Sequence, residues 1–254
     1  MLNIAVCDGK EEILHRISAL VSGEFRRRGI SIHLFRFMSG KEMLHADEQN
    51  PFQVVFLDIF MTDYDGRQIA DIMRKRHERI KIIFVTGHAE FVYDSFTYQP
   101  YAFIVKEDSV LMKQRFSQVV SRIELEESQK KAIVLKDINI GEQTVFFQDI
   151  VVIESDRNYL EYIVQNYKDP LRVRGTITKV EELFAPHYFI RVHRKNIVNM
   201  IHILYIDQKR QVIVMDNGTN IIMGGSYRQS VMDMYQRFLA MKGGYLSTFC
   251  QLKF

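Results

Sequence analysis

The sequence predicts an α/β domain with a doubly wound, five-stranded parallel sheet, followed by a mainly antiparallel β domain. Three observations support this fold class. The chain has 254 residues, a length that suits two domains of roughly 100–150 residues each. The first half alternates short apolar runs with segments of helical periodicity, which is typical of βαβ units. The second half contains many short β-rich runs and few helical segments, which is typical of an antiparallel β domain.

Five short apolar runs predict the strands of the first half, and three amphipathic segments predict helices. The unbroken apolar run Val54–Leu57 is typical of a central strand that is buried on both faces. In the helical segments, apolar residues recur at three- and four-residue steps and form one face. The predicted strands are Leu2–Cys7, Ile32–Phe37, Val54–Leu57, Ile82–Val85 and Ala102–Val105, and the predicted helices are Glu11–Arg28, Gly66–Arg76 and Val110–Lys130.

The polar, highly charged stretch ELEESQKK at residues 124–131 separates the two halves. Its composition predicts the end of a helix that runs into a linker. We therefore place the first domain at residues 1–125, the linker at 126–132, the second domain at 133–241 and a C-terminal tail at 242–254.

Short β-rich runs predict most of the second half. Asp216-Asn217-Gly218 lies between two of these runs, and Asn-Gly is a strong signal for a two-residue hairpin turn. Helical patterns predict helices at Ile177–Phe184 and Ser226–Met241. The predicted strands are Ile133–Leu135, Val145–Phe147, Val151–Glu154, Leu160–Val164, Ile203–Ile206, Val212–Met215 and Ile221–Met223.

The composition excludes several classes of protein. Hydrophobic residues make up 47% and charged residues 26% of the chain, which excludes a disordered tail, a collagen-like fibre and a disulfide-rich scaffold. The two cysteines, Cys7 and Cys250, suit a reducing compartment. The N-terminus has no signal-peptide pattern, and no window reaches the roughly 18 apolar residues of a spanning helix. We therefore expect a cytoplasmic protein without a membrane partner.

The net charge of +3 is distributed unevenly along the chain. Residues 1–130 contain 18 Lys and Arg against 19 Asp and Glu, whereas residues 131–254 contain 16 against 12. An excess of four positive charges is common by chance. The second half is nevertheless the better candidate for binding an anionic partner.

Four polar residues stand at the ends of predicted strands, where parallel sheets bind ligands. They are Asp8, Asp58, Thr86 and Lys106. A carboxylate can act as a nucleophile, and a divalent ion held by carboxylate oxygens offsets the charge of a phosphoryl group. A hydroxyl and an ammonium can contact phosphoryl oxygens. Any one of these residues alone is better explained as a helix cap, but the four in this order favour phosphoryl transfer.

The same segments resemble the receiver domains of two-component response regulators, over about residues 1–125. FLDIFMTDYDG, FVTGH and AFIVKED are similar to the segments that carry that family's phosphoacceptor, switch threonine and lysine. The resemblance implies that a sensor histidine kinase phosphorylates Asp58 with Mg²⁺ bound. It also implies Mg²⁺ ligands at Asp8, Asp58 and the backbone carbonyl of Ile59, and a switch set of Thr86, Phe103 and Lys106.

Three positions depart from the receiver pattern. Gly9 replaces a second acid that in the family typically contacts the metal, Glu107 replaces a proline after the lysine, and Thr62 replaces another proline. The loss of the acid at Gly9 is the most serious of these. It leaves open an alternative in which Mg²⁺ binding is weak and the first domain works without phosphorylation.

The second half resembles the LytTR family of bacterial DNA-binding domains, over about residues 131–240. FIRVHRKNIVN is its most specific segment, and VVIESDRNYLEYIV and GGSYRQSV stand in the expected order. The family fold is a ten-stranded β arrangement that inserts loops into successive major grooves of DNA. The resemblance implies base-edge contacts from Arg194, Arg228 and either Tyr159 or Asn158, and phosphate contacts from Lys195, Lys179 and Tyr227.

Several polar residues of these segments have simpler structural explanations. Arg191 and His193 alternate beside Phe189 and fit a hydrogen-bonded strand, and Asn199 fits a turn or cap. Glu154 fits an internal pairing partner, because a carboxylate repels phosphate.

Together, the two resemblances predict a LytTR-type response regulator that dimerises on phosphorylation and binds paired sites on double-stranded promoter DNA. The alternative is a phosphorylation-independent LytTR transcription factor. A phosphatase needs a second catalytic acid two residues after the nucleophile, where Phe60 stands, so we expect no enzyme. A receiver joined to a domain that does not bind DNA is disfavoured by FIRVHRKNIVN. The apolar tail could pack on its own domain or on a partner.

Overall fold

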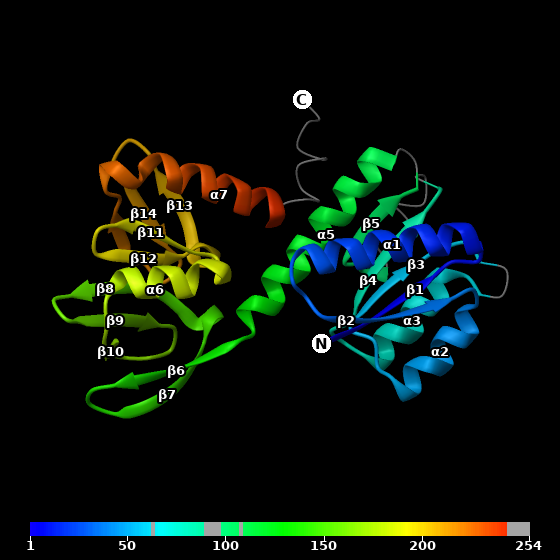
Figure 1. The fold of residues 1–254 in the computed structure, drawn as a ribbon, viewed down its shortest axis with the longest axis horizontal. Helices are drawn as coiled ribbons and strands as arrows, with labels where there is room; N and C mark the ends of the chain where they lie inside the picture. The colour runs from blue at the N-terminus through cyan, green and yellow to red at the C-terminus, as the bar shows by residue number, and fades with distance from the viewer. Residues whose placement is uncertain (62–63, 89–97, 107–108, 243–254) are drawn as a thin grey trace. The chain divides into compact units, whose positions relative to one another are not determined.

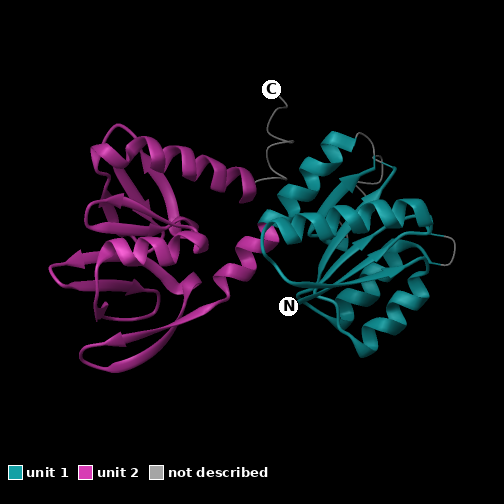
Figure 2. Cartoon of the chain, in the orientation of Figure 1, with its two compact units in different colours: residues 1–121, 245–254 teal, residues 122–244 magenta. Residues whose placement is uncertain are grey.

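The structure is a computed structural model that describes residues 1–61, 64–88, 98–106 and 109–242. Contacts between residues divide these into two compact units, one up to Ser121 and one from Arg122 onward (Figure 2). Each unit has its own hydrophobic core.

The first unit is a five-stranded parallel sheet covered by helices. Apolar stretches form the strands, and the central strands β3 and β4 are buried along their whole length. Helices α1 and α5 lie on one face and α2 and α3 on the other (Figure 1). The strand order is β2-β1-β3-β4-β5. The bounds are β1 Leu2–Cys7, α1 Glu11–Arg27, β2 Ile32–Phe37, α2 Gly40–Gln49, β3 Val54–Leu57, α3 Gly66–Arg76, β4 Lys81–Thr86, β5 Ala102–Val105 and α5 Ser109–Gln129.

Helix α5 contributes side chains to both units. Phe116 is fully buried in the first unit and stacks on Phe56 of β3, with 5.4 Å between ring centroids. Further along, Leu125 is buried in the core of the second unit. The stretch 126–132, for which the sequence predicts a linker, begins with the last residues of this helix.

The second unit contains ten strands in two antiparallel sheets. The seven-stranded sheet has the order β11-β12-β8-β9-β10-β6-β7, and the three-stranded sheet the order β13-β14-β15. Helix α6 (Ile177–Phe184) covers a core rich in aromatic rings, and helix α7 (Arg228–Lys242) covers the second core. The strands are β6 Ala132–Asp137, β7 Gly141–Phe146, β8 Ile150–Asp156, β9 Tyr159–Val164, β10 Leu171–Arg174, β11 Phe189–His193, β12 Asn196–Asn199, β13 Ile203–Asp207, β14 Val212–Met215 and β15 Asn220–Ile222.

The fold class predicted from the sequence is confirmed. The five apolar runs form the parallel sheet, and Asn217-Gly218 closes the β14–β15 hairpin, where Gly218 has a φ of +85°. The strands β10 and β12 were not predicted, whereas β11 was expected from the alternation of Arg191 and His193 beside Phe189. β10 has arginine at alternate positions, and β12 begins and ends with asparagine, so neither contains a long apolar run.

Candidate functional site

The first candidate site lies at the carboxyl ends of four neighbouring strands. Asp8 follows β1, Asp58 follows β3, Thr86 ends β4 and Lys106 follows β5. Since these strands are adjacent in the sheet, their ends converge. Two backbone bonds fix the junctions: Asp58 N–H donates to the Cys7 carbonyl at 2.9 Å, and Lys106 N–H donates to the Thr86 carbonyl at 2.8 Å.

The Lys106 ammonium bridges the two carboxylates. Its Nζ lies 2.6 Å from Asp8 Oδ2 and 2.8 Å from Asp58 Oδ2. Asp8 is fully buried, whereas 12% of the Asp58 side chain is exposed. Only Asp58 therefore combines contact with the cation and access from solvent, which is what an attacking carboxylate needs.

The protonation of Asp58 reflects two opposing effects. Burial raises the pKa of the Asp58 carboxyl above its ordinary value, and Lys106 opposes this through a hydrogen bond and its charge. The Asp8 carboxylate nearby raises the pKa of Asp58 further. A less solvated carboxylate is a stronger nucleophile once it is ionised, and Lys106 favours that ionised form.

Thr86 of β4 and Phe103 of β5 have different surroundings. Thr86 is fully buried, and its Oγ1 accepts a hydrogen bond of 3.3 Å from the His88 N–H. Phe103 lies opposite Phe84 in the β4–β5 register and belongs to the hydrophobic core. Phe60 and His88 extend from the loops after β3 and β4, and their ring centroids are 4.7 Å apart.

The loop after β3 depends on Gly66. A Cβ atom at Gly66 would lie 2.1 Å from the Asp58 carbonyl oxygen, so any other residue would displace the backbone around Asp58. The Gly66 N–H also donates to the Ile59 carbonyl at 2.8 Å, which occupies one lone pair of that predicted metal ligand. Asp65 caps α3 and pairs with Arg67, and this hydrogen bond lowers the pKa of Asp65.

The convergent oxygens fit a magnesium ion only partly. The described residues contain no group of three or more His, Cys, Asp or Glu side chains placed to hold a metal. Mg²⁺ in proteins is often held by one or two carboxylates and completed by water and substrate oxygens, so Asp8 and Asp58 could hold it. A Cβ atom at Gly9 would meet nothing closer than the Met61 Cα at 4.0 Å, so the position of the missing acid is sterically open.

The second candidate site is one end of the seven-stranded sheet. β8 ends at Asp156. Its antiparallel partner β12 begins at the same end of the sheet, with Asn196 opposite Glu154. The register of β10 places Arg174 opposite Tyr159, beside the β8–β9 turn. The β8–β9 turn, the start of β12 and the end of β10 therefore lie at the same end of the strands, which we call the DNA edge of the sheet.

The turn between β11 and β12 presents two cations at this edge. Arg194 and Lys195 are exposed. Arg191 supports the turn, since its guanidinium donates to the Arg194 carbonyl at 2.9 Å and pairs with Glu181 at 2.8 Å. The Lys195 carbonyl accepts a hydrogen bond from Ser155 N–H at 2.7 Å, which ties the turn to β8.

The residues from Gly224 to the start of α7 at Arg228 lie against β11, next to the β11–β12 turn. Gly224 N–H donates to the Val192 carbonyl of β11 at 2.8 Å. The Tyr227 ring lies 5.8 Å from the Arg191 guanidinium carbon, and Arg228 is exposed with its Nη2 donating to the Gln208 carbonyl at 2.9 Å.

Of the predicted pair Asn158 and Tyr159, only Asn158 is exposed. The Tyr159 ring is covered by the Arg172 guanidinium at 4.8 Å, and Arg172 also pairs with Asp156 at 2.8 Å. Asn199 caps a short helical turn and donates to the carbonyls of Phe147 and Ile150, each at 3.0 Å. Glu154 accepts a hydrogen bond from Asn196.

Comparison with known proteins assigns both units. Residues 4–111 match the response regulator receiver domain, and residues 141–236 match the LytTr DNA-binding domain. Accessory gene regulator protein A of Staphylococcus epidermidis is 30% identical over 186 residues, covering 69% of this chain and 76% of that protein. The chain belongs to the LytTR family of response regulators.

The chain is also similar to another curated regulator and, over parts of its length, to solved structures. The transcriptional regulatory protein LytR of Staphylococcus aureus is 24% identical over 210 residues, covering 74% of this chain and 81% of that protein. A LytTr DNA-binding domain from Bacillus cereus is 25% identical, with a TM-score of 0.37, and covers 41% of this chain and 96% of that chain. The response regulator TrrA of Thermotoga maritima, in complex with Mg²⁺-BeF, is 22% identical, with a TM-score of 0.40. The match covers 47% of this chain and 99% of that chain.

Two further cations of this response regulator, which the sequence analysis did not select, lie at the same end of the seven-stranded sheet. Arg157 is exposed at the tip of the β8–β9 hairpin and has a φ of +55°, and Arg174 is exposed at the end of β10. Within the described residues, neither side chain has an ion-pair partner. The signal for Arg157 was its place in the turn Asp156-Arg157-Asn158, between two apolar runs.

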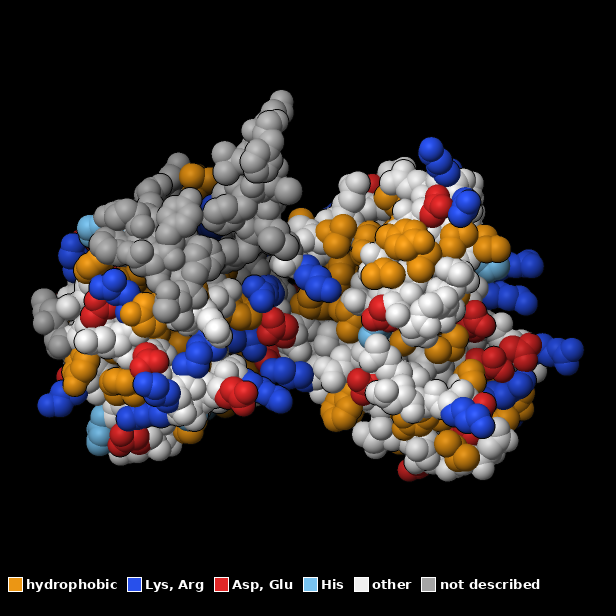
Figure 3. Space-filling view, turned by 180° about the vertical axis from the view of Figure 1, so that it is seen from behind, with side chains coloured by type: hydrophobic (Ala, Val, Ile, Leu, Met, Phe, Trp, Pro, Cys, Tyr) orange, Lys and Arg blue, Asp and Glu red, His pale blue; other side chains and the backbone are white. Residues whose placement is uncertain are grey.

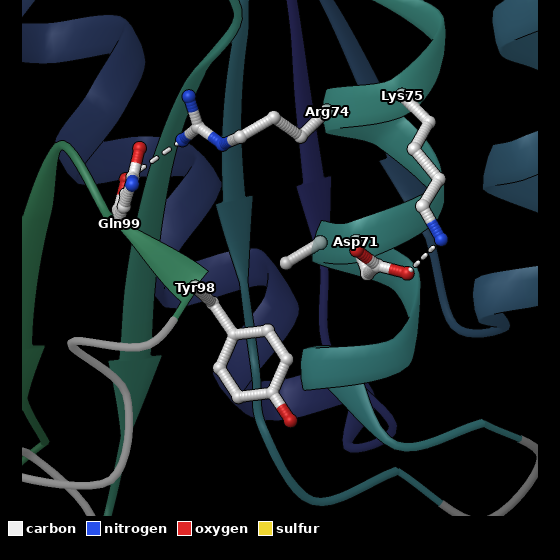
Figure 4. Close-up of a pocket in the computed structure, with 6 residues that line it drawn as sticks. Asp71, Arg74, Lys75, Tyr98 and Gln99 are labelled. Carbon is white, nitrogen blue, oxygen red and sulfur yellow. Dashed lines mark hydrogen bonds and ion pairs between the residues drawn. The ribbon is translucent and has the colours of Figure 1, made fainter.

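A pocket of 310 Å³ lies elsewhere in the receiver, between α3 and Tyr98–Gln99 (Figure 4). Arg74 donates to the Gln99 carbonyl at 2.8 Å, and Lys75 pairs with Asp71 at 2.6 Å. None of the predicted site residues lies there, so the pocket is not part of either site. Among the described residues, no helix has both the length and the apolar character needed to cross a membrane.

Proposed function

We propose that this response regulator is a cytoplasmic transcription factor whose DNA binding is switched by phosphorylation of Asp58. The observation that carries the proposal is the bridge from Lys106 to both Asp8 and Asp58 at 2.6 and 2.8 Å. A cation held between a buried and a partly exposed carboxylate is arranged to neutralise the charge of an incoming phosphoryl group.

In the proposed reaction, an Asp58 carboxylate oxygen attacks the phosphorus atom of a phosphohistidine on a sensor histidine kinase. The bond from phosphorus to the histidine nitrogen breaks, and an acyl phosphate forms on Asp58. Lys106 keeps an ion pair with the new phosphoryl oxygens, and Thr86 donates its hydroxyl to one of them. Mg²⁺, held by Asp8 and Asp58, would offset phosphoryl charge when bound.

The proposed output is binding of double-stranded promoter DNA by one end of the seven-stranded sheet. Arg194, Arg228 and Asn158 are exposed there and would contact base edges, and Lys195 would contact phosphates. Tyr159 is a weaker candidate, because its ring is occupied by Arg172. Dimerisation of phosphorylated receivers would bring two such ends to paired DNA sites and raise occupancy through effective concentration.

The test is the intact mass of the full chain after incubation with Mg²⁺ and acetyl phosphate, followed by a gel-shift titration with a promoter fragment. We expect the gain of one phosphoryl mass and tighter DNA binding, both lost in Asp58→Asn. This variant keeps the size of the side chain and removes the nucleophile. DNA binding that is tight and identical in both proteins, with no gain of mass, would contradict the phosphorylation switch.

The same experiment addresses the alternative that Gly9 raises. With one carboxylate fewer, Mg²⁺ binding is weaker and the receiver could act without a phosphoryl donor. In that case DNA binding would show its usual salt dependence but no response to acetyl phosphate.

A further inference from the structure

The outward face of the three-stranded sheet in the second unit is apolar and uncovered within the described residues. The inward face packs against α7, with Ile213, Met215 and Ile221 in the core. On the outward face, Ile222 is 71% exposed, Leu204 is 64% exposed and Tyr205 is 54% exposed. Seen from behind, hydrophobic side chains gather on the upper part of this unit (Figure 3), the region of β13 and β14 in Figure 1.

The strand register places Tyr205, Val212, Val214 and Ile222 on one face, and the exposed Leu204 lies at the register shift beside Tyr205. Tyr205 lies opposite Val214, and Val212 lies opposite Ile222. Residues directly opposite in an antiparallel pair share a face. We call the surface formed by Leu204, Tyr205, Val212, Val214 and Ile222 the outer patch.

The outer patch departs from the usual pattern of an antiparallel sheet. A sheet with one face on the core normally alternates apolar residues inward with polar residues outward. Here both faces are apolar along β13 and β14, and contiguous exposed apolar surface of this kind marks an interaction site. On this face, Asp207 lies opposite Val212 and Asn220 lies opposite Val214. The other side chains of the face are apolar, so the surface favours an apolar occupant.

The chain carries an apolar segment of suitable length directly after this unit. Residues 243–254, GGYLSTFCQLKF, lie outside the described residues and contain Tyr245, Leu246, Phe249, Leu252 and Phe254 with one charge, Lys253. The two glycines that follow α7 are typical of a helix end where the chain reverses direction. Twelve residues extend to about 40 Å.

Helix α7, which precedes this segment, packs beside the strand that begins the outer patch. The Tyr235 hydroxyl donates to the Ile203 carbonyl at 3.3 Å, which places α7 against the start of β13. From Tyr235 to Lys242 the helix advances about 10 Å. β13 is an edge strand of its sheet, so a chain that leaves α7 can pass around it.

We propose that residues 243–254 bind the outer patch of their own chain, with the aromatic and leucine side chains of the tail covering Leu204, Tyr205 and Ile222. Attachment to the same chain gives the tail an effective concentration of about millimolar or more. This favours it over a second copy as the occupant. The inference does not depend on phosphorylation or on DNA binding.

The test uses Cys250, which lies within the tail and is the partner for an introduced thiol. In the full chain carrying Ile222→Cys or Leu204→Cys, mild oxidation should give an intramolecular disulfide to Cys250, identified by peptide mass mapping. Cys7 is 1% exposed and stays reduced. Val134→Cys and Leu183→Cys are matched controls, because these apolar side chains of the same unit are 59% and 55% exposed. A disulfide brings Cα atoms to about 4–7 Å, so only positions under the tail should react.

A second measurement covers the case in which oxidation perturbs the fold. With Cys250→Ser in place, the Ile222→Cys thiol should react with a maleimide on the order of tenfold more slowly in the full chain than in a chain that ends at Lys242, given the expected local concentration of the tail. Equal rates, or equal cross-linking at Val134→Cys, would overturn the proposal. Cross-links only between chains, rising with protein concentration, would overturn it in favour of a second copy.

Discussion

At the scale of single residues, Gly9 gives the sharpest test of the receiver site. The position has room for a side chain, and an added carboxylate would supply a further hard oxygen ligand. We predict that Gly9→Asp binds Mg²⁺ about tenfold more tightly, equivalent to about 1.4 kcal/mol, and is labelled faster by acetyl phosphate. Calorimetric titration with Mg²⁺ measures the first effect. Gly9→Asn is the control without charge, and equal affinities for all three proteins would contradict the prediction.

Arg157 allows strain and DNA contact to be separated. Its φ of +55° is a left-handed conformation, which costs a non-glycine residue about 1 kcal/mol. We predict that Arg157→Gly keeps or raises the free energy of unfolding while DNA affinity falls by about tenfold, the value of one lost contact. Gln211→Gly, at a φ of +58°, is the control. It should affect stability alike and leave DNA affinity unchanged, as urea titrations and gel shifts would show.

Residues directly after strands could be predicted from the sequence, and residues defined by tertiary contacts could not. Asp8 and Asp58 lie at the same end of the sheet, as expected, because each directly follows a short strand of mainly apolar residues. The covering of Tyr159 by Arg172 depends on the β9–β10 register, which no local pattern specifies. The roles of the selected residues in phosphorylation and DNA contact stay predictions.

At the scale of elements, α5 determines where the second unit begins. Leu125 is buried in that unit's core, and Gln129 Nε2 donates to the His187 carbonyl at 2.6 Å. We predict that a fragment of residues 122–242 is more stable than one of residues 133–242 by about 2–5 kcal/mol, the usual cost of losing a buried leucine. Urea unfolding compares the two. Leu125→Ala in the longer fragment should remove most of the difference, and equal midpoints would contradict the assignment.

The elements of the first half were more predictable than those of the second. Strands buried on both faces leave unbroken apolar runs, and α3 was predicted with the bounds it has, Gly66–Arg76. β10 carries Arg172 and Arg174, and β12 begins and ends with asparagine. The strand signal is weaker there because polar side chains shorten the apolar runs.

At the scale of the whole molecule, the proposed DNA binding depends on cations that have no carboxylate partner in the described part of the chain. Carboxylates near the proposed DNA edge are paired, for example Asp156 with Arg172 and Glu181 with Arg191. Arg157, Arg174, Arg194 and Lys195 have no ion pair within the described residues. If about four to six cations contact phosphates, the logarithm of the association constant falls against the logarithm of salt concentration with a slope of about −4 to −5. Fluorescence anisotropy at several salt concentrations measures it.

The matched control for this slope is chosen from the same unit. Lys195→Ala should reduce its magnitude by about 1, the expected effect of one phosphate contact. Arg210→Ala, which removes a cation whose side chain is 84% exposed in the β13–β14 turn, should leave it unchanged. Equal slopes for all three proteins would contradict the assignment of Lys195.

The continuity of α5 also has a consequence for how the chain folds during synthesis. The helix residues up to Ser121 pack on strands that are synthesised before them. Leu125 packs in a core that is complete only after Phe238 has been synthesised. Starting a helix is the unfavourable step of helix formation, and extending one is not. The receiver, which leaves the ribosome first, therefore provides a started helix onto which the second unit assembles. Refolding of the DNA-binding unit should accordingly be faster in the full chain than in a fragment that begins at residue 122.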